Sequence, residues 1–304
     1  MDDAAPSRQA RTAFIALIVA NLFLAAGPWM VRLADVGPVA AGFWRLALAI
    51  PFLAFLAWRS GGGKAAPTTA LIVTIVIGGL FFAADLAAWH VGIHLTKLAN
   101  ATLFGNSSSF LFAIYGFVLL RTLPTKVQGA AIALAVIGTA LLLGGSYDLS
   151  PQNLRGDLLA ILAGFFYCFY LIAIDRARKV MAPMPVLAIA TAAGALPILL
   201  FSIALGEQVL PVNWGPVILL SAGSQLFGQG LLVYAMGHLS PVVVGVGLLT
   251  QPVAAAAIGW LAYRETFGLM DLAGAILICA ALVLIRLPAP KLASEASEDH
   301  GEGR

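Results

Sequence analysis

The sequence predicts an all-α polytopic membrane protein with ten transmembrane helices, arranged as two inverted five-helix repeats. Hydrophobic residues make up 61% of the 304 residues and charged residues only 10%, and the mean hydropathy is +0.96. Soluble domains do not need so apolar a composition, whereas each helix that spans a bilayer takes roughly 20 apolar residues. Segments of that length fill most of the chain, which leaves no room for a folded domain outside the membrane.

The expected spans follow one another with short gaps. They cover residues 12–33, 38–58, 68–90, 98–120, 127–145, 156–174, 184–205, 212–236, 241–262 and 269–287. Residues 1–11 are expected to form a cytoplasmic N-terminal segment. A signal peptide is disfavoured, because the apolar run behind Arg11 is too long and leads into further spans. The acidic tail 288–304 is expected to be a disordered cytoplasmic tail, because it lacks the apolar residues for a core.

An internal repeat relates residues 12–145 to residues 156–287. A constant offset without a gap pairs His94 with His238, Asn106 with Thr250, Asp85 with Gln229, and Arg121 with Glu265. A repeated apolar unit of this length indicates two copies of one design. Because each copy has an odd number of spans, the second copy enters the membrane from the opposite side. Inverted repeats of this kind suit alternating access around a site near the midplane.

The basic residues set the expected orientation, because short cytoplasmic loops accumulate Lys and Arg. With the N-terminus inside, the cytoplasmic set is Arg8, Arg11, Arg59, Lys64, Arg121, Lys126, Arg176, Arg178, Lys179, Arg286, Lys291 and Arg304. The external set is Arg32, Lys97, Arg155 and Arg264. We therefore expect both termini in the cytoplasm and the chain in a bacterial inner membrane. No basic, aromatic-rich patch remains that would bind nucleic acid.

Two stretches carry a family resemblance. Pro38 followed by Phe43-Trp44-Arg45, and the run from Leu248 through Pro252 to Glu265, are similar to motifs of the EamA branch of the drug/metabolite transporter superfamily. The resemblance covers about residues 12–287. It implies a central cavity lined by helices 1 to 4 and 6 to 9, with the fifth and tenth helices packed outside. The substrates it implies are amino acids, other metabolites or drugs, commonly exported from bacteria.

Within that family the chain looks most like a bacterial amino-acid exporter, with aromatic amino acids among the candidate substrates. Sugar phosphates are disfavoured, because the basic pair that their carriers place in the ninth span is missing from residues 241–262. The resemblance to the family is weaker in the first repeat, which has Ser108 where the family often has proline and Arg121 where it often has glutamate. The alternatives are a proton-coupled multidrug or metabolite efflux carrier and, from another class, a diffusive channel.

An enzyme is disfavoured, because the sequence has no nucleophile with a base, no metal cluster and no group of convergent carboxylates. His94 and His238 are expected in loops, without the carboxylates or cysteines that would make a metal site with them. No cofactor is expected. The expected partners are a small-molecule substrate and the lipid bilayer.

Polar and aromatic side chains near the middle of the spans are the candidates for the cavity wall. Long amides and phenolic hydroxyls need hydrogen-bond partners in a dry environment, and the alternative for each is a hydrogen bond between helices. Serine is weaker evidence, because its hydroxyl can bond to the preceding turn of backbone. The expected cavity residues are Trp44, Asn106, Ser107, Tyr167, Tyr170, Gln225, Gln229 and Gln251.

Arg45 and Asp85 are the two formal charges expected well inside the spans. A charge at membrane depth is costly and usually faces a partner or a wet cavity. Either the two form an ion pair that holds two helices together, or they meet the ends of a zwitterionic substrate or gate the outer mouth. If they pair, Asp85 stays ionised, which favours facilitated over proton-driven transport. Pro28 and Pro252 are the expected hinges, because proline removes a helical hydrogen bond.

Overall fold

The computed structural model describes residues 8–60, 67–96, 101, 104–121, 123–144, 151, 153–251, 253–254, 257–258, 261 and 268–285. Every regular element within these ranges is a helix. The elements are α1 (Arg8–Ala25), α2 (Gly27–Leu33), α3 (Pro38–Ala47), α4 (Ile50–Ser60), α5 (Thr69–Leu95), α7 (Ser107–Leu120), α8 (Lys126–Gly144), α9 (Leu154–Arg178), α10 (Pro183–Ala204), α11 (Trp214–Leu220), the π-helix η1 (Ser221–Gln229), α12 (Gly230–Met236), α13 (Pro241–Leu248) and α15 (Leu269–Leu284).

The lengths of these helices fit a membrane. Six helical segments among the described residues are long and apolar enough to span a bilayer: Arg8–Leu33, Pro38–Ser60, Thr69–Leu95, Leu154–Arg178, Pro183–Ala204 and Trp214–Met236. Shorter apolar helices cover Ser107–Leu120, Lys126–Leu141 and Leu272–Ala281. The all-α polytopic class is therefore confirmed. One local expectation is wrong, since His94 lies in the last turn of α5 and not in a loop.

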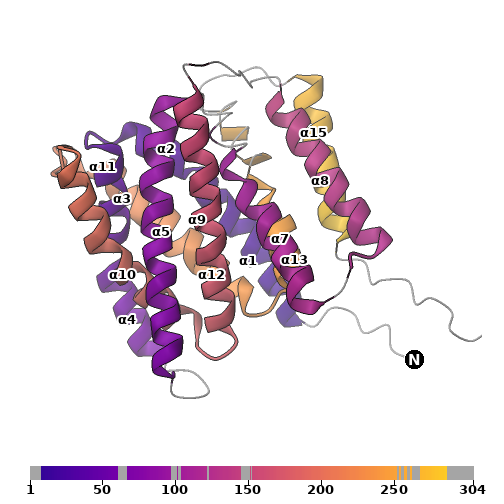
Figure 1. Cartoon of the computed structure of the whole chain (residues 1–304), viewed down its shortest axis with the longest axis horizontal. Coiled ribbons are helices and arrows are strands. Elements are labelled where there is room, and N and C mark those ends of the chain that lie inside the picture. The colour runs from indigo at the N-terminus through magenta and orange to yellow at the C-terminus, as the bar shows by residue number, and fades with distance from the viewer. Residues whose placement is uncertain are drawn as a thin grey trace, which may run out of the picture.

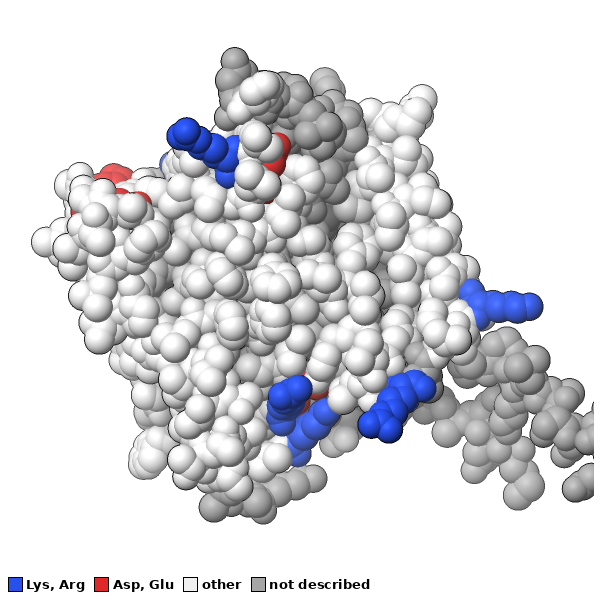
Figure 2. Space-filling view, in the orientation of Figure 1, with Lys and Arg blue, Asp and Glu red and all other residues white. Residues whose placement is uncertain are grey.

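The helices run side by side, with α5 and α9 packed along each other through the middle of the bundle (Figure 1). Helices α8 and α15 pack against each other at one side of the bundle, as the family resemblance implies for the fifth and tenth spans. Figure 2 shows a group of Lys and Arg side chains at its lower end, where the turn between α9 and α10 is found, and others at its upper left and right.

Glycine allows two of the central helices to touch backbone to backbone. A Cβ added at Gly79 of α5 would lie 2.3 Å from the carbonyl oxygen of Ala190 in α10, a contact that no side chain tolerates. Small residues commonly bring membrane helices this close, because association in lipid depends on van der Waals packing. The contact fixes α10 of the second repeat against α5 of the first.

Several spans are interrupted near their middle. The first span breaks at Ala26, between α1 and α2, and the second at Leu48 and Ala49, between α3 and α4. The helical turn is also interrupted at Asn106 in the fourth span and at Thr250 in the ninth, which is the pair of positions that the internal repeat aligns. The eighth span contains η1, a π-helix of a length seldom found outside functional sites. Broken backbone at membrane depth is tolerated where it borders protein or a polar cavity.

Candidate functional site

A cavity of about 90 Å³ lies in the centre of the bundle and draws its walls from both halves of the chain. That volume holds several water molecules, since one water needs roughly 10–15 Å³ measured in this way. The lining residues are Leu24, Ala25, Pro28, Arg45, Phe82, Asp85, Leu86, Trp89, Gly105, Asn106, Ser108, Ser109, Tyr167, Gln229 and Gln251. Apolar and aromatic walls with a few polar groups are typical of a small-molecule site.

Half of the expected cavity residues line this space. The structure places Asn106, Tyr167, Gln229 and Gln251 on the wall. Asn106 and Gln251 arrive there on the interrupted turns of the fourth and ninth spans, where the helical backbone is already broken. The register of the repeat and the length of the amide side chain were together enough to single out these two positions.

Gln229 is the central residue of a buried chain of hydrogen bonds that starts at the cavity wall. Its amide nitrogen donates to the Tyr167 hydroxyl at 3.0 Å, and its amide oxygen accepts from the Tyr170 hydroxyl at 3.1 Å. Tyr170 is fully buried and stacks on Phe82, with ring centroids 4.5 Å apart. Tyr170 therefore does not line the cavity, contrary to expectation. It orients the Gln229 amide, and through it the Tyr167 hydroxyl at the wall.

Gln225 also lies behind the wall and not on it. It is fully buried, its amide nitrogen donates to the Thr191 hydroxyl at 2.9 Å, and its amide oxygen accepts from Nε of Arg45 at 3.2 Å. The π-helical backbone of η1 turns Gln225 toward α3 and α10, away from the cavity. Gln225 is a positioning residue for Arg45.

Arg45 and Asp85 line the cavity together, and their side chains do not form an ion pair within the described part of the chain. The Arg45 guanidinium lies over the Phe82 ring, 5.4 Å from its centroid, a cation–π arrangement. Gln225 and the Phe82 ring both contact the Arg45 guanidinium. Of the two alternatives for Arg45 and Asp85, the ion pair between helices is not formed in this conformation.

Two further candidates lie away from the cavity. Trp44 donates from Nε1 to the Val209 carbonyl at 2.6 Å and meets Trp214 edge to face, because α3 turns it toward the loop that precedes α11. Ser107 faces α9 at Gly164, and its buried hydroxyl has no partner among the described residues. Its neighbours Ser108 and Ser109 reach the cavity instead, because the helix turns by about 100° per residue.

The comparison with known proteins decides the family. The model of the EamA-like transporter family matches residues 11–144 and again residues 154–287. The chain belongs to the EamA-like transporter family. The motif resemblance is thus confirmed at the level of the family, and the protein is a membrane transporter.

One curated protein and one solved structure are similar to this chain over most of its length. The transporter is 23% identical over 280 residues to a protein of Archaeoglobus fulgidus described as an uncharacterized transporter, a match that covers 88% of this chain and 95% of that one. A solved crystal structure of a protein has a TM-score of 0.73 and 17% identity, over 92% of this chain and 98% of the other. The structural likeness supports the fold alone.

Pro28, one of the two expected hinges, is the second residue of α2, which follows the break at Ala26, and it lines the cavity. A movement of α2 would therefore change the cavity wall. The second expected hinge, Pro252, lies outside the described residues.

Polar contacts join α1 to the ninth span beside the transporter's cavity. Asn21 donates from its amide nitrogen to the Gly247 carbonyl and to the Thr250 hydroxyl, both at 2.7 Å. Its amide oxygen accepts from Gln251 at 3.3 Å. Asn21 lies about one helical turn before Leu24 and Ala25 of the wall, so these bonds lie next to the cavity on the side of the N-terminal end of α1.

On the other side, the loop between α10 and α11 holds the start of α3. The Glu207 carboxylate accepts from the backbone N–H groups of Val39 at 3.2 Å and Ala40 at 2.8 Å, which caps the helix that carries Arg45. The imidazole of His90 lies behind this start, with Nδ1 2.8 Å from the Pro38 carbonyl. Because a carbonyl only accepts, Nδ1 carries the proton. His90 supports α3 and does not line the cavity.

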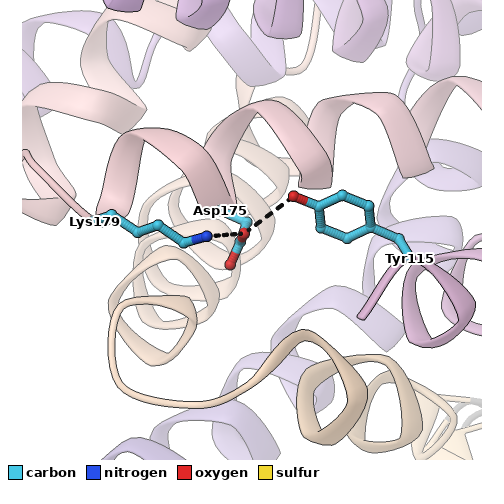
Figure 3. A network of polar contacts seen from close by, with 3 residues as sticks. All are labelled: Tyr115, Asp175 and Lys179. Atoms are coloured by element: carbon cyan, nitrogen blue, oxygen red, sulfur yellow. Dashed lines mark hydrogen bonds and ion pairs between the residues drawn. The ribbon is translucent and has the colours of Figure 1, made fainter. Parts of the chain in front are cut away.

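Two buried acids of α9 escaped the sequence analysis. Asp157, beside the C-terminal end of α5, accepts from the Thr96 hydroxyl at 2.7 Å. Asp175 accepts from the Tyr115 hydroxyl of α7 and pairs with Lys179, each at 3.4 Å (Figure 3). Helix α9 extends beyond the expected span at both ends, which places these acids on its buried face. The helical spacing of Asp175 and Lys179 was the signal available in the sequence.

Proposed function

We propose that this EamA-like transporter exports small metabolites, most favourably amino acids, by alternating access through the central cavity. The observation that carries the proposal is the composition of the cavity wall. Amide, hydroxyl and charged groups from both repeats converge beside the rings of Phe82, Trp89 and Tyr167. Such a wall suits a small polar molecule with an apolar side chain, such as an amino acid.

The size of the cavity supports a small substrate over a large drug. A pocket that encloses a drug-sized ligand usually measures about 300–1,000 Å³, whereas this cavity has about 90 Å³. The contacts of Asn21 support a carrier over a diffusive channel, because they join α1 to the ninth span at one end of the cavity. A carrier needs such a closure on one side at a time.

The proposal includes the setting of the protein. We place it in a bacterial inner membrane with both termini in the cytoplasm, because the basic residues favour that orientation. In that orientation the end of the cavity beside Asn21 faces the cytoplasm, and export releases the substrate at the outer surface.

Purified protein in liposomes tests the proposal. The liposomes are challenged with a panel of amino acids and amphipathic cations, with and without a pH gradient, and counterflow is measured. We expect saturable uptake that internal amino acid accelerates, a property that a carrier has and a channel lacks. Flux that rises linearly with concentration would indicate a channel, and a response to amphipathic cations alone would indicate a multidrug carrier.

A further inference from the structure

The cavity wall carries two side chains of opposite charge whose terminal groups have no partner among the described residues. Arg45 projects from α3 and Asp85 from α5, and both line the cavity. Arg45 uses only Nε, in its bond to Gln225. Among the described residues, neither the Nη groups of Arg45 nor the carboxylate of Asp85 makes a hydrogen bond or an ion pair.

Unpartnered charges at this depth require an explanation. Removing an ion from water is expensive, and the expense is recovered only when a complementary group takes the place of the water. The simplest complement for each charge would be the other, because the two lie on the same wall. They form no ion pair, and the guanidinium is instead held by Gln225 and by the Phe82 ring.

Because its guanidinium is held in a fixed position, Arg45 is preorganised to bind an anion. Gln225 is itself anchored, through its bond to Thr191 of α10, so the support extends across three helices. A guanidinium held in this way presents its Nη groups as a fork that matches the two oxygens of a carboxylate. Asp85 in its ionised form only accepts hydrogen bonds, and in that form it is complementary to an ammonium group.

The aromatic wall favours the same ligand. Trp89 lies one helical turn beyond Asp85 on α5, and both side chains line the cavity. An ammonium group at Asp85 would therefore lie near an aromatic ring, which attracts cations. The remaining wall near Phe82 and Leu86 is apolar and suits a hydrocarbon side chain.

We propose that the cavity reads both ends of a free α-amino acid, with the ammonium group at Asp85 and the carboxylate at the Nη groups of Arg45. This inference rests on the proposed function and adds its chemistry. The substrate needs an unblocked amine and an unblocked carboxylate. N-acylated amino acids and amino-acid esters are excluded, because each lacks one of the two charges.

Three compounds on one carbon skeleton test the inference: leucine, 3-methylbutylamine, which lacks the carboxylate, and 4-methylpentanoate, which lacks the amine. The same set is built on phenylalanine, with phenethylamine and 3-phenylpropanoate. Binding is measured by calorimetry on the purified protein in nanodiscs, because amines and weak acids cross liposome membranes unaided. The variants are Asp85→Asn and Arg45→Gln, with Arg59→Gln as the control at the exposed end of α4.

Each variant should lose affinity only for the ligands that carry the charged group its side chain is proposed to bind. Asp85→Asn should weaken the amino acid and the amine by about 10- to 100-fold and leave the acid unchanged, and Arg45→Gln should weaken the amino acid and the acid and leave the amine unchanged. Arg59→Gln should change none of the three. Asp85→Glu and Arg45→Lys, which keep the charges, should retain the preference for the zwitterion.

The outcomes separate this inference from the proposed function. Equal losses for all three ligands in one variant would mean that the residue only supports the fold, and would overturn the inference. So would amino-acid exchange in liposomes that both variants leave intact, although the proposed function would then stand. If the wild-type protein binds neither amino acid and exchanges another substrate, both the inference and the amino-acid proposal fail.

Discussion

Gln225→Leu is the substitution that most directly tests how the cavity is held. The side chain is fully buried and bonds to Arg45 at 3.2 Å and to Thr191 at 2.9 Å. Leucine fills a similar volume but offers Nε of Arg45 no acceptor. A hydrogen bond to a charged group contributes about 1.5–3 kcal/mol. Each 1.4 kcal/mol corresponds to about a tenfold change in affinity.

We expect the half-saturation concentration of Gln225→Leu to rise by about tenfold, the lower end of that range, because the Nη groups of Arg45 can still reach the substrate. The assay is counterflow in liposomes at matched protein content, with the thermal unfolding midpoint recorded to show that the fold is intact. Thr191→Val is the control, because it removes the bond of Gln225 to α10 and leaves the bond to Arg45. Its shift should be smaller.

Two results would refute this reasoning. An unchanged half-saturation concentration in Gln225→Leu would mean that the orientation of Arg45 does not matter for binding. An equal shift in Thr191→Val would mean that packing of η1 against α10, and not the bond to Arg45, is what the substitution disturbs. Gln251→Leu, at the wall itself, should also raise the half-saturation concentration, and unchanged transport in both glutamine variants would move the site elsewhere.

The remaining predictions concern topology, packing and coupling. Cysteines at Ser60 and Gln208, in a background without the native cysteines, should react with an impermeant reagent from opposite sides; labelling from one side would defeat the proposed orientation. Gly79→Ala should lower the unfolding midpoint through overpacking of about 1–3 kcal/mol, whereas Gly129→Ala, with open space around it, should not. Because Gln229, the repeat partner of Asp85, cannot titrate, imposed proton gradients should not drive accumulation in the wild type or in Asp85→Asn, and accumulation that the Asn variant abolishes while exchange survives would make Asp85 the proton carrier.

The distribution of apolar residues determined the spans, and the repeat in the sequence determined their pairing. Each span needs an apolar length set by the bilayer, so the helices could be placed from composition alone. The gapless offset between Asn106 and Thr250 went further, because both positions prove to interrupt their helices. Asn106 and Gln251 could be assigned to the cavity because the repeat places both amides near the middle of their spans. A polar amide on a broken turn at mid-membrane depth has few other places to satisfy its hydrogen bonds.

Tertiary structure decided which way each side chain points, and the sequence does not contain that choice. In a membrane helix every face can be apolar, so the amphipathic pattern that orients helices in soluble proteins is weak. Trp44 therefore turned out to face the loop before α11, and Ser107 to face α9, while Ser108 reached the cavity. The separation of Arg45 from Asp85 was decided in the same way. It depends on Gln225, a residue far along the chain that only the packing of the two repeats brings to Arg45.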